Sequence, residues 1–299
     1  MAHPDNAFYG HNRALARYVG RADVPIIDGH LQHGWSPYTG LAEPHRLVGR
    51  LTKFLWSSQN LAQARAAGIE RLNPIGAPFV YLEAVDDGSR EPAPPGSMIV
   101  YPYHSIERTA FFANHRRYID EIRDRATGPV TVCLYWRDHD LVEVRSLYED
   151  AGFRVICHGR REDALFLERQ LVELRGHEVV ATNRVGSALW YGAYLGLDAV
   201  VFGPVFGQWE AEEGARYDAF QRSRYPELFD PSATPEDRTT RAGVELGAEH
   251  RRPASELSRM LGWDPGRSAP RPALRLRTIT EHRTRTAVHH LRRLVRHAA

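Results

Sequence analysis

Two segments of the chain end in residues that can do chemistry. The segment 25–34 begins with apolar residues and ends at His33, which has a glycine beside it. An imidazole with its ordinary pKa of about 6.5 can take a proton from a hydroxyl at neutral pH. His33 is therefore a candidate general base, with His30 as the alternative. A histidine that only hydrogen-bonds its own loop fits the pattern equally well.

The second segment runs from an apolar stretch at 178–183 into helical spacing at 185–195. Asn183, Arg184, Gly186 and Ser187 lie where the strand gives way to the helix. The first N–H groups of a helix and its positive dipole end bind anions, and glycine lets a ligand approach the backbone. This pattern predicts a diphosphate site to which Arg184 adds charge. An ordinary turn capped by Asn or Ser is the alternative.

Further polar residues follow other expected strands and are candidate contacts for a nucleotide: His104, Ser105, Arg137 and His158. A second candidate acid–base group is Asp87 in the Asp-Asp-Gly run at 86–88, which is also a common turn sequence. The histidines are scattered and no Asp-x-Asp pair ends a strand, so the sequence predicts neither a metal site nor a cofactor.

The elements that must position these residues follow from hydrophobic periodicity. Strands are expected at 98–105, 130–136, 153–158, 178–183 and 199–203, with helices at 107–126, 139–151, 162–175 and 185–195 between them. This alternation predicts an α/β Rossmann-like domain with a parallel sheet. Strands at 25–34, 53–58 and within 72–82, with a helix at 59–67, predict a second, smaller α/β domain.

Composition divides the chain further. The segment 83–97 is rich in Pro, Gly and charge, which predicts a linker and domains at 1–95 and 96–205, followed by a helical extension over 206–299. Residues 267–299 hold nine arginines and one acid, a charge of +8, whereas the whole chain carries only +2. A terminal helix at 276–297 that is solvated, packed or docked on an anionic membrane fits this tail. The tail lacks aromatic residues, which disfavours nucleic-acid binding.

Two cysteines exclude a disulfide framework. The chain also has no signal pattern and no apolar run long enough to span a membrane. These features favour a cytoplasmic protein, with peripheral association at the inner membrane face if the basic tail binds lipid.

The motifs occur in an order that resembles a known family. The unit of strand, Asn183, Gly186-Ser187, helix and strand, followed by Gly203-Pro204, resembles the nucleotide-binding half of GT-B glycosyltransferases. The turn at 32–34 and the later Ile-Gly-Ala-Pro turn at 75–78 resemble the acceptor half of bacterial capsule, polysialic-acid and glycerophosphate polymer transferases. The resemblance covers about residues 8–205.

This resemblance implies two Rossmann-like domains facing a cleft, the N-terminal one reduced. It also implies metal-independent transfer of a sugar from a nucleotide-sugar donor to a hydroxyl of a glycan or glycosylated small molecule, as in polysaccharide biosynthesis. Three alternatives stay open: a CMP-nonulosonate transferase that uses Asp87, a GT-B-fold epimerase or pyruvyltransferase, and a nonenzymatic assembly protein.

Overall fold

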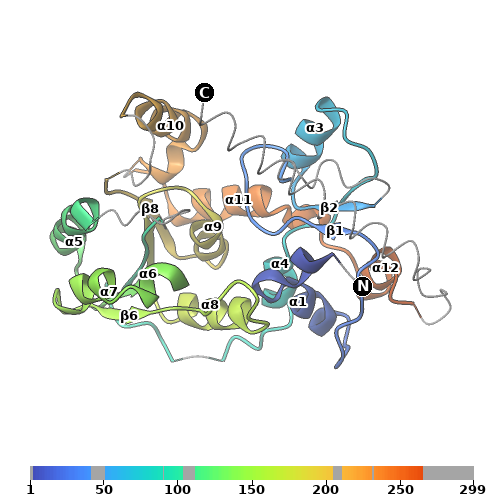
Figure 1. Ribbon diagram of the computed structural model, residues 1–299, viewed down its shortest axis with the longest axis horizontal. Coiled ribbons are helices and arrows are strands. Elements are labelled where there is room, and N and C mark those ends of the chain that lie inside the picture. The colour runs from blue at the N-terminus through green and yellow to red at the C-terminus, as the bar shows by residue number, and fades with distance from the viewer. Residues whose placement is uncertain are drawn as a thin grey trace, which may run out of the picture. The chain divides into compact units, whose positions relative to one another are not determined.

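The computed structural model describes residues 3–41, 51–89, 91–103, 112–204, 211–230 and 232–264 (Figure 1). His104, Ser105 and the basic tail at 267–299 lie outside these residues. Within the described part of the chain, no helix combines the length and apolar character needed to cross a membrane.

The chain folds into two compact units where three segments were expected. Of the described residues, those up to 86 and those from 244 onward form the first unit, and those between 87 and 243 form the second unit. Residues after 243 belong with the N-terminal segment because they complete its core. Leu246, Leu257 and Leu261 are buried, and the backbone N–H of Ala77 donates to the carbonyl of Leu246 at 2.8 Å. Composition alone gives no signal of which core a C-terminal helix joins.

The first unit contains a small parallel sheet of order β1-β2-β3, with β1 (His30–Leu31), β2 (Lys53–Leu55) and β3 (Leu72–Pro74). Helix α3 (Ser58–Ala66) connects β2 to β3, and the hydroxyl of Ser57 caps it by accepting from the N–H of Asn60 at 3.3 Å. The strands are shorter than expected. Pro78 starts a helix, α4 (Pro78–Glu83), because proline suits the first turn.

Helices and one-turn elements surround this sheet: η1 (Pro4–Gly10), α1 (His11–Tyr18), η3 (Ala248–His250) and α12 (Ala254–Leu261). Helices α1 and α4 lie side by side (Figure 1), and the rings of Tyr18 and Tyr81 meet edge to face at 4.9 Å. Phe54, Trp56 and Phe79 fill the core of the unit.

The second unit is built on a five-stranded parallel sheet of order β6-β5-β4-β7-β8. Its strands are β4 (Met98–Tyr101), β5 (Val130–Cys133), β6 (Arg154–Ile156), β7 (Val179–Thr182) and β8 (Asp198–Val201). The strands occur in the predicted order along the chain, and all pairs are parallel. The expected α/β class, with a parallel sheet in each unit and a reduced N-terminal sheet, is therefore confirmed.

The strand order of this unit reverses between β4 and β7. From β4 the chain first builds outward through β5 to β6, then returns to the other side of β4 for β7 and β8. In open α/β sheets, ligands bind at the carboxyl ends of the strands where such a reversal occurs. The two strand ends that meet there are those of Tyr101 and Thr182.

The connecting helices are α5 (Phe112–Arg125), α6 (Trp136–Asp140), α7 (Val142–Glu149), α8 (Phe166–Arg175) and α9 (Ser187–Tyr194). They are followed by α10 (Ala211–Arg224), η2 (Pro226–Leu228) and α11 (Pro235–Leu246). One boundary differs from the sequence prediction: β5 pairs with β6 only as far as Cys133, and Trp136 begins α6. Arg137 therefore lies on a helix, not at the end of a strand.

Helix α9 packs directly on β7 through a glycine. A Cβ atom at Gly192 would lie 2.5 Å from Cγ1 of Val180, closer than two carbon atoms that are not bonded to each other can approach. The helix that follows the candidate phosphate turn is thus fixed to the sheet by contact with its backbone.

We expect Gly192→Ala to lower the free energy of unfolding by about 1–3 kcal/mol, because the added methyl group overpacks the interface between α9 and β7. Chemical denaturation measures the change. Gly186→Ala is the matched control, since its Cβ would have no neighbour nearer than 3.9 Å. Equal stability of the two variants would contradict this packing.

Candidate functional site

The carboxyl ends of β4, β7 and β8 are held together by one side chain. Oδ1 of Asn183 accepts from the backbone N–H of Tyr103 at 2.7 Å, and Nδ2 donates to the carbonyl of Pro204 at 2.7 Å. Asn183 is only 5% exposed. Both ends of its amide are engaged within the protein, so it orders the loops at the strand ends. The direct phosphate contact expected of Asn183 is not what its geometry favours.

Arg184 follows Asn183 and is held between two aromatic rings. Its guanidinium carbon lies 4.3 Å from the ring centre of Tyr103 and 4.2 Å from that of Tyr217 on α10. Cation–π contacts of this kind fix the orientation of a guanidinium without neutralising it. Burial raises the pKa of Tyr103, so its phenol stays neutral at physiological pH. Arg184 is therefore a preorganised, half-buried cation.

Helix α9 begins directly after this arginine. Gly186 is its N-cap in an extended conformation (φ −161°, ψ −177°). The preceding turn is fixed because the N–H of Val185 donates to Oε1 of Gln221 at 2.7 Å. Gly186, Ser187 and Ala188 are half-buried, so the first turn of the helix is reachable from outside. The N–H groups of a first turn have no acceptor within the helix and carry the positive dipole end.

We call this arrangement the switch-point site: Tyr103, Asn183, Arg184, Gly186, Ser187 and Tyr217. The sequence predicted four of these residues. It did not single out the two tyrosines because Tyr103 lies within the expected strand at 98–105 and Tyr217 within the expected helical extension, neither in a motif of its own. Their pairing across Arg184 arises only from the fold.

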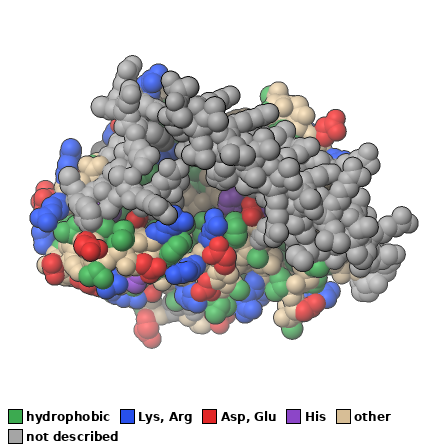
Figure 2. All heavy atoms as spheres, viewed as in Figure 1, with side chains coloured by type: hydrophobic (Ala, Val, Ile, Leu, Met, Phe, Trp, Pro, Cys, Tyr) green, Lys and Arg blue, Asp and Glu red, His purple; other side chains and the backbone are tan. Residues whose placement is uncertain are grey.

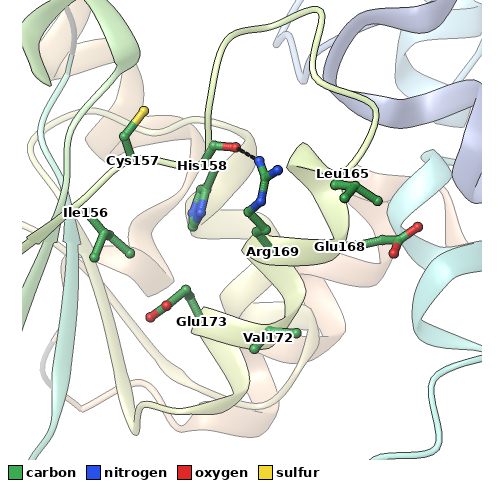
Figure 3. A pocket seen from close by; sticks show the side chains of 8 residues that line it. All are labelled: Ile156, Cys157, His158, Leu165, Glu168, Arg169, Val172 and Glu173. Carbon is green, nitrogen blue, oxygen red and sulfur yellow. Dashed lines mark hydrogen bonds between the residues drawn. The ribbon is translucent and has the colours of Figure 1, made fainter. Parts of the chain in front are cut away.

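A pocket of about 350 Å³ opens beside β6 and α8 in the same unit (Figure 3). Its lining residues are Ile156, Cys157, His158, Leu165, Glu168, Arg169, Val172 and Glu173. Arg169 reaches across from α8 to donate to the carbonyl of His158 at 2.6 Å, as Figure 3 shows.

His158 forms part of the wall of this pocket and is only 3% exposed. The phenol of Tyr101, whose pKa burial raises well above its ordinary value, shares a hydrogen bond of 3.0 Å with Nε2 of His158. Burial lowers the pKa of His158 to about 4. At neutral pH the imidazole is therefore uncharged and fixed in orientation. Its predicted contact with a nucleoside stays a prediction.

Arg137 lies near a second arginine at the ends of β5 and β6. The guanidinium carbon of Arg137 lies 5.1 Å from the ring centre of Trp136, and that of Arg160 lies 4.6 Å from the same ring centre. Arg160 also contacts Asp140 at 3.6 Å. Arg137 is exposed, so it is accessible to a ligand, but its contact with Trp136 does not aim it at the switch-point site.

Charge alone does not single out a site among the described residues on the face seen in Figure 2. On the face seen in Figure 2, basic and acidic side chains alternate with hydrophobic ones over the described residues. A site is therefore identified by the contacts of its individual side chains and not by a charged patch.

In the first unit, His33 lies two residues beyond β1, as predicted. The loop that carries it is fixed by Gln32, whose Oε1 accepts from the N–H of Trp56 at 3.0 Å and whose Nε2 donates to the carbonyl of Gly34 at 2.9 Å. The half-buried ring of His33 meets Phe8 edge to face at 5.8 Å. Burial and the nearby His33 lower the pKa of His11 to about 3, so His11 places no charge beside it.

Two of the predicted catalytic residues do not suit that role. His30 is within β1 and only 1% exposed, so its ring is not open to an acceptor hydroxyl from solvent. Asp87 is exposed, and its Oδ1 accepts from the N–H and the hydroxyl of Ser89 at 3.1 and 2.8 Å. These are the contacts of a turn, in agreement with the alternative interpretation of the Asp-Asp-Gly run.

One cluster was not predicted. His3 and Asp5 at the start of η1 lie beside His30 of β1, with one ligand atom of each residue within 4.8 Å of the others. The sequence signal is the His-x-Asp spacing at 3–5, and nothing in the sequence links it with the distant His30. The fold, not the local pattern, brings them together.

Comparison with known proteins gives remote structural likenesses. Neither a protein-family model nor a curated protein matches this chain. Among solved structures, the UDP complex of S. aureus MnaA is 11% identical, with a TM-score of 0.44 over 85% of this chain and 72% of that one. UDP-GlcNAc 2-epimerase from Neisseria meningitidis, bound to UDP-GlcNAc, is 11% identical, with a TM-score of 0.35 over 71% of this chain and 61% of that one.

A mutant of S. aureus TarM, in complex with fondaparinux, alpha-GlcNAc-glycerol and UDP, is 10% identical, with a TM-score of 0.31. That match covers 76% of this chain and 47% of the other. Likenesses this remote assign no role to any residue of this chain.

The buried His158 predicts a stability that depends on pH. Its folded-state pKa of about 4 lies below the unfolded value of about 6.5, so its contribution is present above pH 6.5 and is lost as the pH falls toward 4. Through this group the folded state loses about 2 kcal/mol between pH 7 and pH 5.

We expect His158→Gln to flatten the pH dependence of the unfolding free energy by that amount, because glutamine can keep a hydrogen bond to Tyr101 but does not titrate. Denaturant titrations at several pH values measure it, with His139→Gln as the control. A slope in His158→Gln as steep as that of the unaltered protein would contradict the assignment.

Proposed function

We propose that this protein is a glycosyltransferase that moves a sugar from a nucleotide-sugar donor to a hydroxyl of a glycan or glycosylated small molecule. One observation carries the proposal: at the strand reversal of the second unit, the Arg184 guanidinium is fixed between two rings, beside the accessible start of α9. A cation of fixed orientation and a set of convergent N–H donors suit a diphosphate, which carries several negative charges.

Both groups favour the departure of a nucleoside diphosphate. As the bond from the sugar to the diphosphate breaks, negative charge grows on the leaving oxygen. Donors that are already oriented toward this charge lower the barrier without having to reorganise. Arg184 is held by Tyr103 and Tyr217, so little side-chain entropy is lost when it meets the phosphate. The charge of the leaving group is thus borne without a divalent ion.

The acceptor side of the reaction falls to His33. In the proposed step its imidazole takes the proton of the acceptor hydroxyl while the oxygen attacks the anomeric carbon of the sugar. Gln32 fixes the loop that carries His33, which limits the number of ring positions.

We expect Arg184→Ala to weaken nucleotide binding by about 10- to 100-fold, the range for loss of a charged hydrogen-bond partner. The ligand is chosen by thermal shift from UDP, GDP, CDP, CMP, dTDP and ADP, and its affinity is then measured by calorimetry. Arg117→Ala, which removes an exposed arginine paired with Glu121 on α5, is the matched control.

Equal affinity of these two variants would remove Arg184 from the site. A chain that binds none of the six nucleotides would contradict the proposal as a whole and favour a nonenzymatic role. A response to CMP alone would favour the nonulosonate transferase.

His33→Ala should lower turnover by about 10²-fold or more while donor affinity stays unchanged, because the base acts on the acceptor proton and not on the donor phosphates. Release of the nucleoside diphosphate measures turnover, and calorimetry measures donor binding. Asp87→Asn separates the alternatives: the nonulosonate transferase requires this acid, whereas an exposed turn does not. Full turnover in His33→Ala would exclude His33 as the base.

A further inference from the structure

The first unit gathers two imidazoles and a carboxylate that the proposed sugar transfer does not use. Nδ1 of His3 lies 4.0 Å from Oδ1 of Asp5, and both residues have a ligand atom within 4.8 Å of a ring nitrogen of His30. His3 and Asp5 come from the first residues described, whereas His30 comes from the first strand. We propose that His3, Asp5 and His30 form a binding site for a divalent transition-metal ion, with zinc as the best chemical fit.

The donor set favours such an ion. Two imidazole nitrogens and one carboxylate oxygen suit zinc and its neighbours in the first transition row, whereas calcium and magnesium prefer oxygen ligands alone. Zinc holds these ligands at about 2.0–2.2 Å, which places neighbouring ligand atoms about 3.4 Å apart around a tetrahedral ion. The cluster needs to contract only by about 1 Å, a movement that side-chain rotation provides.

The ligands are held in place by the protein before any ion arrives. Nδ2 of Asn6 donates to the carbonyl of Gly29 at 2.9 Å, and Oδ1 of Asn6 accepts from the N–H of Leu31 at 2.8 Å. This buried amide therefore grips β1 on both sides of His30. The N–H of Asn6 also donates to the carbonyl of His3 at 3.0 Å, which closes the turn that carries His3 and Asp5. One residue thus ties the backbone of the turn that carries His3 and Asp5 to the strand that carries His30, while the side chains can still rotate toward an ion.

The three ligand side chains are largely shielded from water. The side chains of His3 and Asp5 are 2% and 13% exposed, and His30 is 1% exposed. A carboxylate among buried groups is costly unless a positive charge compensates it. A bound divalent ion would place a positive charge beside this carboxylate.

The nearest strand neighbour does not compete for the site. Lys53 pairs with His30 in the sheet register, but its ammonium donates to the carbonyls of Leu51 and Glu70 at 3.1 and 3.3 Å. The rings of His3 and His30 meet edge to face with centres 4.5 Å apart. The competing explanation is that this ring contact and Asp5 merely pack the N-terminal segment against β1.

Metal binding by the full chain tests the proposal. After treatment with chelator and dialysis, the protein is titrated with Co²⁺, whose visible absorption reports tetrahedral nitrogen and oxygen ligands, and with Zn²⁺ in competition. We expect one equivalent of Zn²⁺ to bind. Asp5→Asn and His3→Gln should each weaken binding by about tenfold or more, since each loses a ligand.

Matched variants keep the test decisive. His139→Gln removes a histidine of the second unit and should leave Co²⁺ and Zn²⁺ affinity unchanged. Asp5→Asn keeps the shape of a half-buried side chain, so its circular dichroism should match that of the unaltered protein. The test therefore does not need a variant of the buried His30, whose substitution could impair folding.

Two results would overturn the proposal. One is the lack of a Co²⁺ spectrum and of Zn²⁺ binding in the unaltered protein. The other is Zn²⁺ affinity that Asp5→Asn and His3→Gln leave unchanged, which would put the ion on other residues. The titrations contain no nucleotide, so their outcome does not depend on whether the second unit binds a sugar donor.

Discussion

The Asn183 side chain is the contact on which the candidate donor site depends. Its carbonyl oxygen receives the N–H of Tyr103 after β4, and its amide nitrogen donates to Pro204 after β8. Those two loops belong to strands on either side of β7, so one buried amide sets the spacing of three strand ends. Arg184 and Tyr103 meet only because that spacing is fixed. The site therefore depends on one buried amide with both ends hydrogen-bonded, at the point where the strand order reverses.

The sequence was sufficient for the parts of the fold that repeat. The second unit alternates apolar strands with amphipathic helices, and all five of its strands occur where periodicity predicted them. The first unit was harder to predict because its strands are two or three residues long, too short for a clear period. The return of residues after 243 to that unit was not predicted either. Buried Leu246 and Leu261 carry the same pattern whichever core they join.

The residues of the candidate site could likewise be predicted only in part. Arg184, Gly186 and Ser187 were recognisable because a strand-to-helix turn with glycine has a local signature. Asn183 was identified at the right position, but the sequence could not reveal that both ends of its amide are engaged. Tyr217 and the His3–Asp5–His30 cluster depend on long-range contacts. Burial also changes what a histidine can do: His158 is kept neutral inside the second unit, whereas His33 retains access.

The central claim is that phosphate binds at the start of α9, and hydrogen–deuterium exchange of residues 182–190 tests it most directly. The N–H groups of the first turn of α9 have no acceptor within the helix itself. A nucleoside diphosphate should slow their exchange, while a peptide from α7 on the other side of the reversal stays unchanged. Nucleotide binding that protects other segments and leaves 182–190 unaffected would contradict the account.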